Sequence, residues 1–168
     1  NQSIMEKVAS KCYRPTTTLL LDQIRKNDGR FKVSFSITGT AIEQMQAWAP
    51  DVIDLLQQCA ATGCADFLAE TSHHSLSSLY APAEFKLQVE KHVSLMQELF
   101  DIEPIVFRNT ELIYSDRIAK SVVDMNRFRG MTCEGVDRIL GDRSPAWVYA
   151  PDGSGEHLPS AKIRLLLK

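Results

Sequence analysis

Apolar residues recur along this chain with two different spacings, and each spacing predicts one kind of element. Helical spacing of three or four residues predicts helices over 1–13, 15–27, 41–48, 50–61, 82–100 and 116–125. Alternation of apolar and small polar residues predicts a strand over 31–37. Short apolar runs, which are typical of strands buried on both faces, predict further strands over 65–69, 104–107, 130–133 and 163–167.

Prolines and small polar residues set the expected ends of several helices. Pro15 and Pro50 fit the first turn of a helix, where the missing backbone N–H has no partner to lose. Thr40 and Ser115 are each expected to cap the helix that follows, because a hydroxyl oxygen can accept a hydrogen bond from a free backbone N–H. Residues 75–80 fit neither spacing, and their structure stays open.

Strands and helices alternate from about residue 31 onwards, which is typical of an α/β protein with a parallel sheet. The sheet could be an open doubly wound sheet or a barrel. The chain has no internal repeat and no linker before a loop-like stretch at 151–155, so residues 1–168 form a single domain. Because it starts at Asn1 without an initiator Met, and ends at Lys168 directly after a strand, we expect an incomplete domain truncated at both ends.

The composition excludes several classes of protein. Hydrophobic residues make up 44% of the chain and charged residues 24%, which is an ordinary globular balance. A net charge of −2, spread along the chain, leaves no basic stripe for nucleic acid. No apolar run approaches the roughly 20 residues that cross a membrane. The four cysteines lack zinc-ligand spacing and indicate reduced thiols in a cytoplasmic protein.

Three successive predicted strands are each followed by a glutamate: Glu70, Glu111 and Glu134. Reactive groups of parallel α/β folds gather beyond the carboxyl ends of the strands, so these carboxylates are expected on one rim. Glycoside hydrolysis needs such a rim, because one carboxylate attacks or stabilises the sugar and one carboxylic acid protonates the leaving oxygen. The alternative for each glutamate is a structural residue that favours the start of a helix.

Histidines and aromatic residues near this rim are candidates for substrate contacts. His73 and His74 lie beside Glu70, and a substrate hydrogen bond from one of them is preferred to a metal site, because no H-x-x-x-H or H-E-x-x-H spacing occurs. Trp147 and Tyr149 could stack on a sugar ring. His92, on an apolar helix face, and Trp48, at a helix end, are expected to be structural. No cofactor is expected, since G-x-G-x-x-G and Walker patterns are missing.

Four segments in order then resemble a known family. They are FSITG at 35–39, FLAETSHHSL at 67–76, FRNTELIY at 107–114, and EGVDRILG at 134–141 with RSP at 143–145. Each segment alone is modestly specific, but the four together extend over nearly the whole chain. They are similar to the α-amylase-like branch of glycoside hydrolase family 57.

The resemblance implies a partial, TIM-barrel-like (β/α)7 barrel that acts on α-1,4-linked glucans with retention of configuration, as an α-amylase or a 4-α-glucanotransferase. It places Glu111 at the position of the catalytic nucleophile and Glu70 and His74 in a region that lines the substrate site. A Tyr is common in this branch where the chain has His73. Glu134 and Trp147 are further candidates for glucan contacts.

The resemblance also implies parts that are missing. The first conserved region of the family would precede Asn1, and the aspartate that acts as general acid would follow Lys168, so the 168-residue chain alone is expected to be inactive. Two other readings stay open. One is a metal-dependent polysaccharide deacetylase, which needs an Asp and two His as ligands, and the other is a glucan-binding relative without catalysis.

Overall fold

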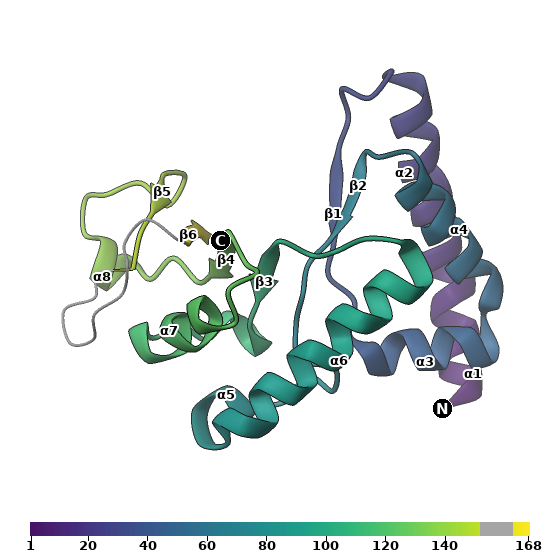
Figure 1. The fold of residues 1–168 in the computed structure, drawn as a ribbon. Helices are drawn as coiled ribbons and strands as arrows, with labels where there is room; N and C mark the ends of the chain where they lie inside the picture. The colour runs from purple at the N-terminus through teal and green to yellow at the C-terminus, as the bar shows by residue number, and fades with distance from the viewer. Residues whose placement is uncertain (152–162) are drawn as a thin grey trace.

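The computed structural model describes residues 1–151 and 163–168, so most of the loop predicted at 151–155 lies outside the described residues, as does His157. Five of the six described strands run parallel to a neighbouring strand, in two groups that form one curved layer (Figure 1). The strands are β1 (Val33–Phe35), β2 (Ala65–Phe67), β3 (Val106–Arg108), β4 (Gly130–Cys133), β5 (Val148–Tyr149) and β6 (Arg164–Leu167).

Within the described part of the chain, one isolated β-bridge joins the two groups of strands. β1 pairs with β2, and the second group runs in the order β3-β4-β6-β5. Ala69, two residues beyond β2, forms a parallel bridge with Phe107 of β3. Its N–H donates to the Val106 carbonyl at 2.9 Å, and its own carbonyl accepts from the Arg108 N–H at 2.7 Å. The parallel arrangement predicted from the alternating elements is therefore confirmed, with β5 as an antiparallel addition to β6.

Helices cover one side of this layer (Figure 1). They are α1 (Gln2–Val8), α2 (Arg14–Lys26), α3 (Gly39–Trp48), α4 (Pro50–Ala61), α5 (Ser77–Tyr80), α6 (Pro82–Phe100), α7 (Asp116–Asp124) and α8 (Asp137–Leu140). The Ser115 cap of α7 is confirmed, because its hydroxyl accepts from the Ile118 N–H at 3.3 Å. The open stretch 75–80 contains α5. None of the described helices is both long enough and apolar enough to cross a membrane.

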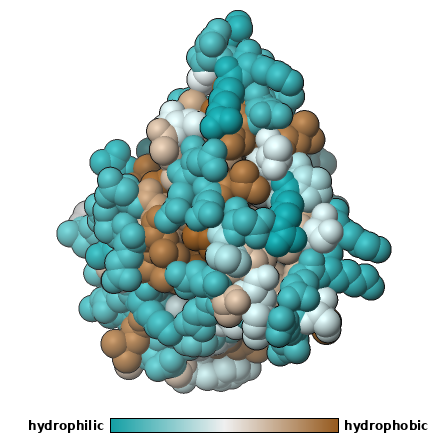
Figure 2. All heavy atoms as spheres, turned by 90° about the vertical axis from the view of Figure 1, so that its right-hand side faces the viewer, coloured by the Kyte–Doolittle hydropathy of each residue, from teal (hydrophilic) through white to brown (hydrophobic). Residues whose placement is uncertain are grey.

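Side chains of alternate strand residues build the core between the strands and the helices. Phe67, Phe107, Met131 and Leu165 all point to this side and are at most 5% exposed. Phe67 stacks on Phe100 of α6 with ring centroids 4.3 Å apart. Trp48 is half-buried against the part of the core around Phe67, so its predicted packing role is confirmed. Figure 2 views the side of α1, α2 and α4, where hydrophilic residues predominate around a hydrophobic centre.

The first two predicted helices are in fact one continuous helical rod from Gln2 to Lys26. A π-helix, Ala9–Tyr13, joins α1 to α2 and is closed by a hydrogen bond from the Arg14 N–H to the Ala9 carbonyl, five residues back. Inside an α-helix the Pro15 ring would collide with the carbonyl four residues earlier. The wider π-turn directly before Pro15 takes up this conflict, so the proline does not start a new helix.

The cap of α3 differs from the prediction by two residues. Thr38, not Thr40, is the cap, with its hydroxyl accepting from the Ala41 N–H at 3.2 Å. The helix starts earlier because Gly39 fits against the turn after β2, where a Cβ on Gly39 would lie 2.7 Å from the Ser72 Oγ. Thr40 instead donates its backbone N–H to the Ser72 carbonyl at 3.1 Å. The turns after β1 and β2 are thus in direct contact.

His92 of α6 connects the segments that follow β1 and β2. Its side chain is 0% exposed. Nε2 lies 2.8 Å from the Ile37 carbonyl, and Nδ1 lies 3.4 Å from the Glu70 backbone N–H. Because the carbonyl needs a donor and the N–H needs an acceptor, the ring is neutral with its proton on Nε2. The predicted structural role of His92 is confirmed, and burial lowers the pKa of the imidazole.

The Gly39 contact predicts that Gly39→Ala lowers the free energy of unfolding by about 1–3 kcal/mol, because the new methyl group overlaps Ser72. Urea denaturation of the protein measures this change. The matched control is the double variant Gly39→Ala with Ser72→Ala, which removes the Oγ and should recover part of the loss. Equal stability of the Gly39→Ala variant and the unaltered protein would contradict the contact.

The His92 environment predicts a pH dependence of stability. The unfolded chain binds a proton on this histidine below about pH 6.5, whereas the folded protein resists it. The free energy of unfolding should therefore fall as the pH drops below about 6.5, by at most about 1.4 kcal/mol per pH unit from this group. In His92→Gln, which keeps a donor and an acceptor, this component should vanish. Urea denaturation at several pH values measures this dependence. The same pH dependence in His92→Gln and in the unaltered protein would show that His92 is not its source.

Candidate active site

The three glutamates predicted for the rim follow the carboxyl ends of β2, β3 and β4, but their surroundings differ. Glu70 is 3% exposed, whereas the Glu111 side chain is 71% exposed. Glu134 is also exposed. A buried and an exposed carboxylate on neighbouring strands can do different chemistry, because burial penalises the charged form unless partners compensate.

Glu70 has two partners on neighbouring strands. The Ser36 hydroxyl, just past β1, donates to its Oε1 at 2.8 Å. A guanidinium nitrogen of Arg108 lies 4.0 Å from its Oε2. Neither Ser36 nor Arg108 is among the predicted site residues, although the alternation of side chains along a strand indicates which side of the layer each one faces. Phe35 and Phe107 face the helices, so Ser36 and Arg108 must face the opposite side of the layer.

Glu111 sits on an unusual turn. Its backbone has φ 53° and ψ 21°, and the next residue, Leu112, has φ 58°. Two consecutive residues other than glycine in the left-handed region cost on the order of 1–3 kcal/mol each, and such strain gathers at functional sites. The conformation turns the Glu111 carboxylate away from the core and into solvent.

A buried amide holds this turn together. Asn109 is 0% exposed. Its Nδ2 donates to the Ile113 carbonyl across the turn at 2.9 Å and to the Ser78 Oγ of α5 at 3.1 Å. Next to it, the Thr110 and Thr71 hydroxyls lie 3.0 Å apart, so the turns after β2 and β3 are tied to each other. Asn109 therefore stabilises the strained turn without contacting the carboxylate.

The Glu111 carboxylate meets one histidine of the predicted pair. His74 Nε2 lies 2.8 Å from Glu111 Oε1. His74 also has a left-handed backbone, with φ 51°, which aims its ring across the gap between β2 and β3. The pKa of the Glu111 carboxyl is held below its usual value, chiefly by the hydrogen bond with His74. The electrostatic effects of His74 and Arg108 lower it further. The carboxylate is therefore ionised at neutral pH.

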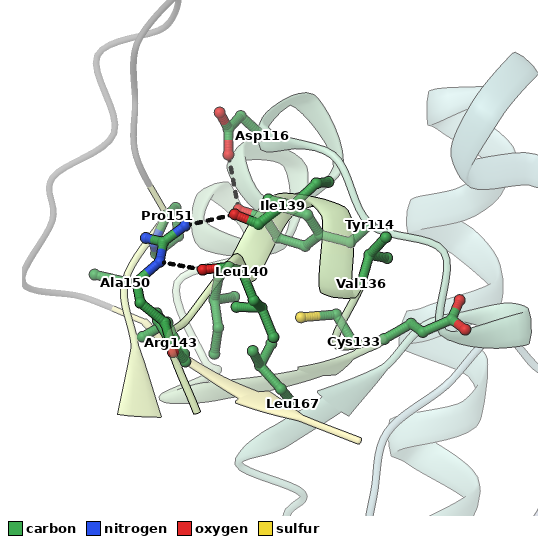
Figure 3. Close-up of a pocket in the computed structure, with 13 residues that line it drawn as sticks. Tyr114, Asp116, Cys133, Val136, Ile139, Leu140, Arg143, Ala150, Pro151 and Leu167 are labelled. Atoms are coloured by element: carbon green, nitrogen blue, oxygen red, sulfur yellow. Dashed lines mark hydrogen bonds between the residues drawn. The ribbon is translucent and has the colours of Figure 1, made fainter. Parts of the chain in front are cut away.

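Glu134 and Trp147 lie apart from this pair. The Glu134 N–H reaches the Leu112 carbonyl at 3.4 Å, but the side chain lines a separate cavity of about 630 Å³. Figure 3 shows that cavity, where Arg143 points to the carbonyls of Ile139 and Leu140. Its strand residues, including Cys133, pack on the helix side of the layer. Trp147 is 62% exposed and precedes β5, with β4 and β6 between it and β3.

Metal ligands do not gather in the described part of the chain. Within residues 1–151 and 163–168, no group of three or more His, Cys, Asp or Glu side chains is arranged to hold an ion. His74 is already paired with Glu111, and His73 is exposed. Burial raises the pKa of the Cys133 thiol to about 11, so this sulfur stays protonated.

Comparison with known proteins gives the family. The model of "Glycosyl hydrolase family 57" matches residues 1–168. A protein of Methanocaldococcus jannaschii named "Putative alpha-amylase" is 44% identical over 155 residues, which are 91% of this chain and 32% of that protein. The chain thus spans about a third of the length of this relative.

Solved structures share the fold. The 4-alpha-glucanotransferase of Thermococcus litoralis superposes with a TM-score of 0.81 over 99% of this chain and 25% of its own, at 16% identity. A protein of Mycobacterium smegmatis titled a putative polysaccharide deacetylase has a TM-score of 0.64 over 90% of this chain and 45% of its own, at 10% identity.

These likenesses confirm that the layer is part of a (β/α)7 barrel. Since two kinds of enzyme share the architecture, the fold alone does not assign the chemistry. The family match is more specific than the fold, because it covers the whole chain and includes both turns that bring His74 to Glu111. The chain belongs to glycosyl hydrolase family 57.

Proposed function

We propose that the complete protein cleaves α-1,4-linked glucans with retention of configuration, as an α-amylase or a 4-α-glucanotransferase, and that Glu111 is its nucleophile. The observation that carries the proposal is the exposed Glu111 carboxylate, held on a strained turn at the carboxyl end of β3. The 4-alpha-glucanotransferase with a similar fold and the relative named as an alpha-amylase support the class of substrate.

A nucleophilic carboxylate must be ionised, accessible and fixed in direction. The lowered pKa of Glu111 satisfies the first condition, because His74 and Arg108 favour the charged form. Its 71% side-chain exposure satisfies the second. The Asn109 amide, by bracing the turn, satisfies the third. Attack on the anomeric carbon would form a glycosyl ester on Glu111, which water or the hydroxyl of a second glucan would then release.

Glu70 is proposed to bind the sugar rather than to attack it. Its carboxylate is 3% exposed and held by Ser36 and Arg108, so it is much less accessible for attack on an anomeric carbon than the Glu111 carboxylate. A buried, oriented carboxylate is suited to accept hydrogen bonds from sugar hydroxyls at the floor of the site. His74 would contact substrate from beside Glu111, and Glu134 and Trp147 would contact glucan units farther away.

The general acid is proposed to come from the remainder of the protein. Retaining hydrolysis needs a carboxylic acid roughly 5–5.5 Å from the nucleophile. Of the glutamates on the described rim, Glu70 is held by Ser36 and Arg108, and Glu134 lines a cavity with residues of α8, β5 and β6 and not with Glu111 or His74. The curated relative is about three times as long as the matched region, which leaves ample chain for this group.

The Glu111 assignment predicts that Glu111→Gln, made in the complete protein, lowers kcat on amylose and maltooligosaccharides at least roughly a thousandfold. The amide keeps the shape of the carboxylate but cannot form the ester intermediate. Product chromatography over time measures the rate. The matched control is Glu103→Gln, an exposed glutamate that precedes β3 instead of following it, and it should keep normal activity. Equal activity of Glu111→Gln and the unaltered protein would exclude Glu111 as the nucleophile.

A further inference from the structure

We propose that a groove beside His74 binds glucose units of the glucan chain next to the unit that Glu111 attacks, and so makes the enzyme prefer longer substrates. This proposal rests on the proposed function. The groove has a volume of about 390 Å³. Ile4, Val8, Tyr13, Gln44, His73 and His74 are among the residues that line it.

The groove is continuous with the candidate active site. His74 lines it and also binds Glu111 through Nε2 at 2.8 Å. Its other walls come from α1, the π-helix and the start of α3. Thr38 and His73, in the turns after β1 and β2, also line it, so the groove reaches the same end of the strands as Glu111. A glucan whose one unit lies at Glu111 can therefore extend past His74 into the groove without crossing a strand.

The lining has the mixed character that suits a sugar. A pyranose ring has apolar C–H faces and a rim of hydroxyl groups, so its sites combine flat apolar surface with a few polar groups. Ile4, 64% exposed, and the half-buried Tyr13 supply the apolar part. Gln44 and His73 supply donors and acceptors from α3 and from the turn after β2. This chemistry favours a neutral oligosaccharide over a charged ligand, since none of the described residues that line the groove is Lys, Arg, Asp or Glu.

The π-helix sets the position of Tyr13. As the last residue of this wide turn, Tyr13 lies where the backbone is displaced from the regular α-helical path. The neighbouring Arg14 forms a two-pronged ion pair with Asp51 in the first turn of α4, which fixes the end of the π-helix on the body of the protein. π-turns inside long helices are frequent at functional sites, and this one presents an aromatic ring to the groove.

The test uses the complete protein with maltotriose and maltoheptaose as substrates. Tyr13→Ala and His73→Ala should each lower kcat/KM for maltoheptaose roughly fivefold to twentyfold more than for maltotriose, because only the longer substrate reaches the groove. Tyr13→Phe should retain most of the preference, since it keeps the ring. Tyr80→Ala is the matched control, because it removes an 82% exposed tyrosine that does not line the groove. It should leave kcat/KM unchanged for both maltotriose and maltoheptaose.

Two results separate the possible failures. If the unaltered protein cleaves or transfers maltooligosaccharides, but both Tyr13→Ala and His73→Ala keep its chain-length preference, the groove is not a glucan subsite and this inference is wrong. If the unaltered protein acts on neither substrate, the proposed function itself is wrong, and the groove proposal is overturned with it. His73 is exposed, so its replacement tests the groove even if Tyr13→Ala impairs folding.

Discussion

The connection between the ends of β2 and β3 is the constraint on which the rest of the structure depends. The Ala69–Phe107 bridge joins the two groups of strands, and the Thr71–Thr110 hydrogen bond continues the connection into the following turns. These contacts are buried, so each lost hydrogen bond would leave an unsatisfied polar group at a cost of about 1–3 kcal/mol. Because the two turns are fixed to each other, His74 from one meets Glu111 from the other.

Strain and support are combined at this junction. His74, Glu111 and Leu112 all have left-handed backbones, which non-glycine residues adopt only when the surroundings impose them. Asn109 and the two threonines supply that support from the buried side, and the exposed carboxylate is the result. Glu70, one strand away, shows the opposite solution, since it is buried and held by Ser36 and Arg108. A reactive carboxylate and a binding carboxylate are thus distinguished by their surroundings.

Local patterns in the sequence were sufficient for part of this description. The spacing of apolar residues predicts α6 and α7, and the short apolar runs predict β2, β3 and β4, because burial on one or both faces repeats regularly along these segments. The positions of Glu70 and Glu111 after strands follow from the same patterns. Their different exposure does not, since it depends on partners such as Arg108 that lie far away in the sequence.

Other features escaped prediction because they depend on tertiary contacts. The π-turn before Pro15 exists only because the helix continues through the proline, against a local signal for a new start. The cap at Thr38 depends on the fit of Gly39 against Ser72, which no single segment encodes. The left-handed turn at Glu111 likewise needs the Asn109 brace. These are the places where the candidate site departs most from regular structure, as expected when function imposes local strain.

The most direct test of the account is to identify the carboxylate that becomes glycosylated. The complete protein would be incubated with a 2-deoxy-2-fluoro-α-maltosyl fluoride, whose C2 fluorine slows release of the covalent intermediate, and then digested for peptide mass spectrometry. The account predicts one fluoromaltosyl group per protein, on the peptide containing residues 109–114 and attached to Glu111. A group attached to Glu70 or Glu134, or cleavage of glucans with inversion and no attached sugar, would contradict it.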